Sequence, residues 1–163
     1  MPSVSVHSSI AAIGRTAWER VASSTHNPFI SFDFLDILEE SGCVSAETGW
    51  SPCHLTVEDD QERVIGVMPL YLKSHSQGEY VFDWSWADAY ERAGGRYYPK
   101  LQCASPFSPV TGPRLIGEAA ARPLLAAGAL QLCRQAGASS VHITFPTKAD
   151  WDFLGDQDFL LRQ

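Results

Sequence analysis

Hydrophobic positions along the chain fall into short runs of period two and longer stripes of period three to four. Val4 and Val6 alternate with serines, which predicts a short opening strand. The runs 53–57 and 64–72 predict two strands joined across the acidic turn 58–62, a loop too long for a two-residue turn. Extended structure is expected again at 101–104 and at 141–145, where Pro146 closes the run.

Helical stripes separate these runs. Thr16-Ala-Trp-Glu19 has capping-box spacing and predicts a helix at about 17–23. Ser31 is a suitable cap for a second helix over 32–40, which Gly42 would end. A third helix fits roughly 119–136 with Pro123 in its first turn, and a short one fits 149–154.

The stretch 73–114 concentrates aromatic and polar side chains. Its first part, 79–86, alternates, which predicts a strand with Phe82, Trp84 and Trp86 on one face. Two interpretations of these rings stay open, because large aromatic side chains fill a core but also form stacking surfaces for ligands. The core interpretation is the more common one for rings of this size.

The order of the predicted elements indicates the fold class. Strands in the first half are largely consecutive, and a strand–helix–strand unit over 101–145 follows, which should cross over with a right hand. We therefore expect an α/β protein of the α+β kind, with a mixed, mostly antiparallel sheet flanked by helices and a single domain over 1–163.

Composition narrows the classes of function. The net charge of −7 has no basic block, which excludes an extended nucleic-acid surface. No apolar run reaches the length of a membrane span, and the amino terminus lacks the features of a signal peptide. The four cysteines form no CxxC pair and the five histidines share no metal-ligand spacing, so we expect a reduced, cytoplasmic protein without a metal.

One motif has the form of a cofactor loop. Arg114-Leu-Ile-Gly117-Glu-Ala119 lies between an extended segment and a helix, where backbone N–H groups can hold a pyrophosphate. Acyl-CoA acetyltransferases of the GNAT superfamily use the pattern Arg-x-x-Gly-x-Ala at such a place. Glu118 and Pro123 argue against this interpretation, because Glu118 adds a negative charge and Pro123 delays the helix.

Several longer motifs resemble a known family. They occur in this order: Asn27-Pro-Phe29, Glu40-Ser-Gly42, Thr48-Gly-Trp50, Met68-Pro-Leu-Tyr-Leu-Lys73, Gly78-Glu-Tyr-Val-Phe-Asp-Trp84, Trp86-Ala-Asp88, Tyr97-Tyr-Pro-Lys100 and Thr111-Gly-Pro-Arg114. The set is similar to the bacterial FemAB-like branch of the GNAT superfamily, which is linked to peptidoglycan biosynthesis or recognition. Proteins of this branch are more than twice as long, so the resemblance implies that this chain corresponds to the N-terminal half. Apolar surface left by a missing half would favour a homo-oligomer.

The resemblance implies an acyltransferase fold and a division of roles. An acyl or aminoacyl group would move from acyl-CoA or aminoacyl-tRNA to an amine, such as that of a cell-wall precursor, with a general base taking the proton of the amine. Candidate groups for the base or for orienting the substrate are His75, Glu79, Asp83 and Asp88. Trp86, Tyr97 and Tyr98 would supply contact area, Lys100 and Arg114 would meet an anionic group, and Gly117 and Ala119 would complete the cofactor loop.

Each of these roles has a structural alternative. Asp83 and Asp88 could make local hydrogen bonds or caps, Lys100 and Arg114 could be surface charges, and His75 could be a loop histidine with satisfied hydrogen bonds. For the whole chain, the alternatives to an acyltransferase are a binding module for cell-wall peptide or sugar and an inactive half-domain.

Overall fold

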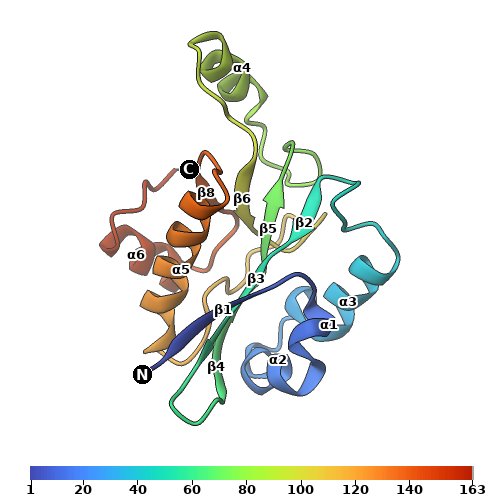
Figure 1. Ribbon diagram of the computed structural model, residues 1–163, viewed down its shortest axis with the longest axis vertical. Helices are drawn as coiled ribbons and strands as arrows, with labels where there is room; N and C mark the ends of the chain where they lie inside the picture. The colour runs from blue at the N-terminus through green and yellow to red at the C-terminus, as the bar shows by residue number, and fades with distance from the viewer. Residues whose placement is uncertain (163) are drawn as a thin grey trace.

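The computed structural model of the protein describes residues 1–162 and is built around one long hairpin (Figure 1). The strands are β1 (Ser3–His7), β2 (Trp50–Pro52), β3 (His54–Glu58), β4 (Val64–Met68), β5 (Leu70–Lys73), β6 (Lys100–Cys103), β7 (Ile116–Gly117) and β8 (Val141–Ile143). The α-helices are α1 (Ile10–Ile13), α2 (Arg15–Ala22), α3 (Phe32–Glu40), α4 (Trp84–Arg92), α5 (Ala121–Gln135) and α6 (Lys148–Asp156). Two 3₁₀ turns, Ser23–Thr25 and Pro28–Ile30, connect α2 to α3.

The two arms of the hairpin are each interrupted once. Strands β2 and β3 form one arm and strands β4 and β5 the other. The register is the same on both sides of the interruption, since Trp50 lies opposite Lys73 and Leu55 opposite Met68, and it shifts only between Val57 and Glu58. Cys53 and Pro69 interrupt the ladder in the middle. The hairpin therefore belongs to two four-stranded sheets, with strand orders β1-β3-β4-β7 and β2-β5-β6-β8.

Proline at position 69 gives a physical reason for the split. The carbonyl of Leu70 accepts from the N–H of Cys53, so Leu70 faces the β2–β3 arm and the nitrogen of Pro69 faces the other edge. On that edge β7 pairs with Gly66 and Val67, and β6 pairs from Leu70 onward. Since Pro69 has no N–H to donate, no partner strand continues past it.

Helices cover the two sheets from different sides. Helices α1 to α3 lie on one side of the hairpin in Figure 1, and α5 and α6 lie on the other. Trp18, Ile30 and Leu35 bury their side chains against Val67 and Ile116 in the first core. The second core forms where α5 and α6 pack against the strands, and it includes Leu55, Leu70, Leu101, Leu125 and Leu154.

The predicted fold class is confirmed: the sheets are mixed, only β6 and β8 pair in parallel among the named strands of residues 1–162, and helices flank them. The helix over 32–40 begins after Ser31, whose hydroxyl accepts from the N–H of Phe34. The capping box at Thr16 is wrong. Helix α2 begins earlier, after Gly14, and the Glu19 carboxylate accepts from the N–H of Phe32 instead.

The predicted strand over 79–86 is also wrong. Residues 74–99 leave the sheet after Lys73 and return at Lys100, and these two residues pair directly with each other. The edge of β5 is therefore already occupied. Residues 79–83 form a loop, and Trp84 begins helix α4, which projects from the body in Figure 1. Phe82 is 84% exposed, so the core interpretation of its ring is wrong too.

Candidate functional site

Two buried lysines face each other where β5 meets β6. Lys73 and Lys100 are cross-strand partners, and neither side chain is exposed to solvent. Like charges at directly opposite positions of an antiparallel pair are destabilising, and burial increases the cost of each charge. The pair therefore requires negative charge from another part of the chain.

Glu79 and Asp83 supply that charge. The Nζ of Lys100 donates to Glu79 Oε2 at 2.7 Å and to Asp83 Oδ2 at 2.8 Å. Lys73 Nζ lies 3.8 Å from Glu79 Oε1, so the Glu79 carboxylate lies between the two lysines. Each carboxylate keeps one buried oxygen without a hydrogen-bond partner, Oε1 of Glu79 and Oδ1 of Asp83. We call these four residues the lysine–carboxylate cluster.

The cluster changes the protonation equilibria of its members. Burial lowers the pKa of Lys73 to about 8, with Glu79 opposing and Lys100 reinforcing this shift. Burial raises the pKa of Glu79, although both lysines oppose the rise. Burial would also raise the pKa of Asp83, but the hydrogen bonds from Lys100 and Tyr97 outweigh it, and the net shift is downward.

Neutral polar groups extend the cluster toward the surface. The hydroxyl of Tyr97 donates to Asp83 Oδ2 at 2.7 Å, and the Ser76 and Tyr98 hydroxyls are 2.7 Å apart. Burial and the neighbouring Asp83 carboxylate raise the pKa of Tyr97, which keeps its phenol protonated. Both tyrosines are half-buried, so the network connects the buried charges with solvent.

The structure thus brings together five of the predicted site residues, listed here: Glu79, Asp83, Tyr97, Tyr98 and Lys100. The surface-charge alternative for Lys100 is wrong, because its side chain is buried. Asp83 stands at the N-cap of α4 but makes no side-chain cap bond there. Its carboxylate points to Lys100 instead.

Six predicted residues lie outside this network, and three of them are the remaining candidates for the base and for the acceptor surface. His75 accepts from the N–H of Gln77 through Nδ1 and lies 3.0 Å from the carbonyl of Thr48 through Nε2. Asp88 is exposed on α4 and pairs with Arg92 at 2.6 Å. Trp86 is 61% exposed, and the guanidinium of Arg162 lies 4.6 Å from its ring.

Arg114, the first residue of the predicted cofactor loop, lies in the protein interior. Arg114 is fully buried and donates to the carbonyls of Val110, Pro113 and Thr144. A guanidinium held in this way cannot reach a phosphate, and it is not a surface charge either. We therefore remove Arg114 from the candidate site.

Gly117 and Ala119 do lie at the surface. Gly117 pairs with Gly66 at the far end of the hairpin, and Ala119 precedes α5. A shallow groove beside Gly117 is also lined by Arg20 and Arg63. Lys73 is seven residues further along the arm than Gly66, which puts roughly 20 Å between this groove and the cluster.

Sequence reasoning missed four residues of the site: Lys73, Ser76, Trp50 and His142. Lys73 Nζ lies 3.7 Å from the centre of the Trp50 ring and donates to the carbonyl of Gln77 at 3.1 Å. The available signal was a lysine at the last position of one apolar strand, β5, and another at the first position of the next, β6, but only the register shows that they face each other. Burial, reinforced by the Lys100 charge, lowers the pKa of His142 to about 4.

A match to a protein-family model adds to this geometry. The FemAB-like model, described as peptidoglycan biosynthesis/recognition, matches residues 9–163. The chain belongs to the FemAB-like family. No curated protein sequence matches it. A solved structure of a Trypanosoma brucei acetyltransferase is similar with a TM-score of 0.49 and 10% sequence identity, covering 100% of this chain and 95% of that one.

In this FemAB-like chain, the lysine–carboxylate cluster holds the excursion 74–99 against the sheet. The cluster fixes the root of α4 and the two tyrosine hydroxyls beside it. Within residues 1–162 no group of three or more His, Cys, Asp and Glu side chains is arranged to hold a metal ion. None of the helices in the described part of the chain has the length and apolar character needed to cross a membrane.

Proposed function

We propose that this protein is an acyltransferase-type member of the FemAB-like family that moves an acyl or aminoacyl group onto an amine of a peptidoglycan precursor. The observation that carries the proposal is the family match over residues 9–163, whose description names peptidoglycan. A cytoplasmic location stays a prediction.

The site geometry supports a division of roles within this proposal. Glu79 and Asp83 are buried and paired with Lys100, so they position the loop and do not contact the acceptor. Asp88 is the solvent-exposed carboxylate among the predicted bases, and we assign it the proton of the incoming amine. The acceptor would lie against Trp86, Tyr97 and Tyr98, beside the root of α4.

The donor would bind from the other end of the hairpin. Arg20, Arg63 and Glu118 line the groove beside Gly117, and its two guanidinium groups suit the phosphates of a donor. The groove and the cluster are roughly 20 Å apart along the arm. This separation suits a donor that carries its acyl group on an extended arm, as acyl-CoA does.

Thermal-shift measurements test the proposal. A ligand of the native state raises the melting temperature, so acetyl-CoA or an aminoacyl-tRNA mimic should stabilise the wild-type protein. The Arg20→Ala/Arg63→Ala variant should lose this stabilisation, and Arg92→Ala, which changes an exposed arginine on α4, should keep it. If no donor shifts the melting temperature, the transfer proposal fails.

A second candidate function is binding of cell-wall material without turnover. It is favoured by one observation: both buried carboxylates are already paired with Lys100, so the cluster contains no free base. Stabilisation by a muropeptide but by no donor would support this candidate over transfer.

A further inference from the structure

Exposed aromatic rings are concentrated on one short segment of this protein. Five rings between residues 80 and 90 are each more than half exposed, and they belong to Tyr80, Phe82, Trp84, Trp86 and Tyr90. Phe107 is the only other exposed aromatic side chain within residues 1–162. Because exposed aromatic groups gathered in one place mark interaction sites, this segment is a candidate docking surface.

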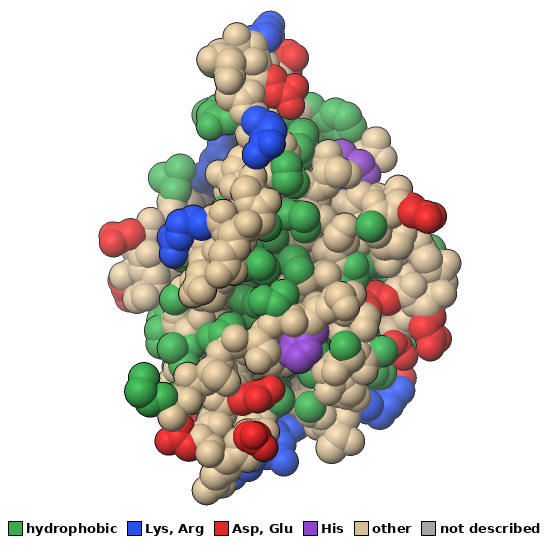
Figure 2. Space-filling view, viewed as in Figure 1, with side chains coloured by type: hydrophobic (Ala, Val, Ile, Leu, Met, Phe, Trp, Pro, Cys, Tyr) green, Lys and Arg blue, Asp and Glu red, His purple; other side chains and the backbone are tan. Residues whose placement is uncertain are grey.

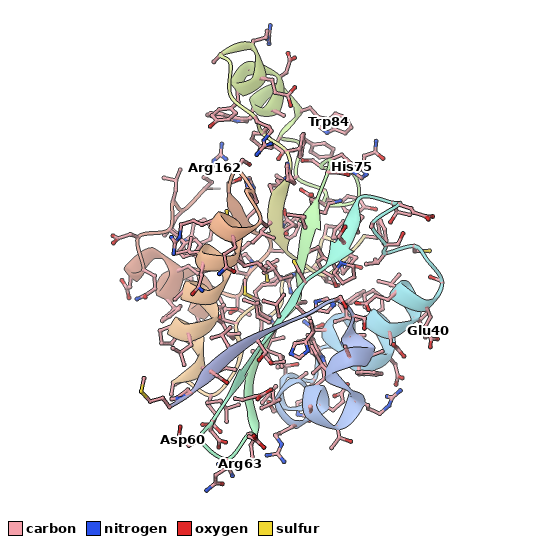
Figure 3. All side chains as sticks on the ribbon, viewed as in Figure 1. Glu40, Asp60, Arg63, His75, Trp84 and Arg162 are labelled. Atoms are coloured by element: carbon pink, nitrogen blue, oxygen red, sulfur yellow. The ribbon has the colours of Figure 1, made fainter. Side chains whose placement is uncertain are left out.

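Two of the five rings already have partners inside the protein. Arg162 lies over Trp86, and the ring of Tyr90 lies 6.3 Å from that of Tyr97 in an edge-on arrangement. In the part of the chain that the structure describes, Tyr80, Phe82 and Trp84 contact no other ring or cation in this way. We call these three residues the aromatic platform. Figure 3 shows Trp84 on the same side of the root of α4 as His75, with Arg162 on the opposite side.

The platform is held in place by the cluster beneath it. Phe82 and Trp84 flank Asp83, whose side chain is buried and bound by Lys100 and Tyr97. Tyr80 follows Glu79, which is bound by the same lysine. Rings attached to fixed backbone lose little conformational entropy when they bind a ligand, and this favours affinity.

The surroundings of the platform argue against a lipid bilayer as its partner. Figure 2 shows charged side chains at the outer end of α4, with hydrophobic groups on both sides below them. Asp88, Glu91 and Arg92 are exposed on this helix and would have to enter the hydrocarbon ahead of the rings. A ligand that is polar at its edges and apolar on its faces fits better.

Pyranose rings have this character, because their C–H faces stack on aromatic rings while their hydroxyl edges form hydrogen bonds. Peptidoglycan, which the description of this family names, consists of a glycan strand and stem peptides. We propose that Tyr80, Phe82 and Trp84 bind the glycan strand of peptidoglycan or its precursor. This inference rests on the proposed peptidoglycan substrate and adds which part of it this surface recognises.

Isothermal titration calorimetry on the full chain tests the inference. Two ligands are used: glycan strands freed of their stem peptides, and a hexamer of β-1,4-linked N-acetylglucosamine. Wild-type protein should bind both. Each ring should contribute about tenfold in affinity, so Phe82→Ala/Trp84→Ala should bind about a hundredfold more weakly. Both side chains are exposed, so the melting temperature of this variant should match that of wild type.

Ile37→Ala is the control, because it removes an exposed apolar side chain from α3, away from the platform, and it should bind the glycan within about twofold of wild type. The inference is overturned if wild type binds neither glycan, or if the double variant binds as tightly as wild type. It is also overturned if light scattering shows that the platform pairs two copies of the chain and glycan has no effect. The donor-induced melting shift, measured on the same double variant, reports on the transfer proposal separately.

Discussion

The imidazole Nδ1 of His54 accepts a hydrogen bond from the backbone N–H of Leu70, 3.2 Å away. Leu70 follows Pro69, at the point where the hairpin ladder is interrupted. The His54 side chain therefore accepts from the Leu70 N–H, which in a regular ladder would have donated to a backbone carbonyl. Since Nδ1 accepts, the proton is on Nε2, which donates to Glu39 at 2.7 Å. The other oxygen of Glu39 accepts from the N–H of Ile10. One buried histidine therefore connects the hairpin with α3 and α1.

Replacing this histidine should destabilise the fold. His54→Leu leaves the Leu70 N–H and a Glu39 oxygen unpaired in the interior, and each such loss costs about 1–3 kcal/mol. We expect a fall of about 2–4 kcal/mol in the free energy of unfolding, measured by urea titration. His7→Leu is the control, because His7 makes one hydrogen bond near the surface, and it should cost less than about 1 kcal/mol. Equal losses in the two variants would contradict this account.

Removing the cation at the centre of the lysine–carboxylate cluster should be more costly. Lys100→Met leaves Glu79 and Asp83 buried without their shared partner, and breaking a buried ion pair from one side costs about 3–5 kcal/mol. Denaturant unfolding at pH 7 measures this loss. Lys148→Met removes an exposed pair with Asp152 and should cost less than about 1 kcal/mol. A loss for Lys100→Met no larger than for Lys148→Met would show that the cluster is not ionised as described.

Stability should fall in mild acid because of His142. Burial and the Lys100 charge lower its pKa from 6.5 to about 4, so the unfolded state binds the proton more readily than the folded state between these values. The stability that His142 contributes is complete above pH 6.5 and is lost progressively as the pH falls, and the loss reaches roughly 3 kcal/mol at pH 4. Unfolding free energies of wild type and His142→Gln, measured from pH 7 to pH 4, should converge as the pH falls. Parallel curves would be the contrary result.

Alanine substitutions at two glycines distinguish the cost of backbone strain from the cost of steric overlap. Both Gly94 and Gly117 have positive φ, +85° and +125°. Alanine at position 94 meets nothing within contact distance, so Gly94→Ala should cost about 1 kcal/mol from conformation alone. Alanine at position 117 would also overlap the carbonyl oxygen of Ile65, and Gly117→Ala should cost about 3 kcal/mol or more. Comparing the two by urea unfolding checks this order, and a reversed order would contradict the tight pairing of β7 with β4.

Local patterns were sufficient for most elements of the fold. Ser31 predicted the start of α3, and the apolar runs 53–57 and 64–72 predicted β3 and the β4–β5 arm, because capping and apolar runs depend on neighbours in sequence. Strand β2 was not predicted. The segment 79–86 shows the limit of such patterns. Its alternation is compatible with a strand, but a strand also needs an open sheet edge, and the pairing of Lys73 with Lys100 occupies that edge.

For the candidate site, too, some features follow from the sequence and others only from the tertiary structure. The sequence by itself determined which segment carries the polar and aromatic groups, and its motifs indicated the family, since both are properties of residues close together in the chain. Only the tertiary structure decided that Lys100 is buried between Glu79 and Asp83, that Lys73 faces it, and that Arg114 belongs to the interior. These facts depend on register and on packing between distant segments. The sequence gives the ionisable type of a side chain, whereas the fold determines its burial and its partner.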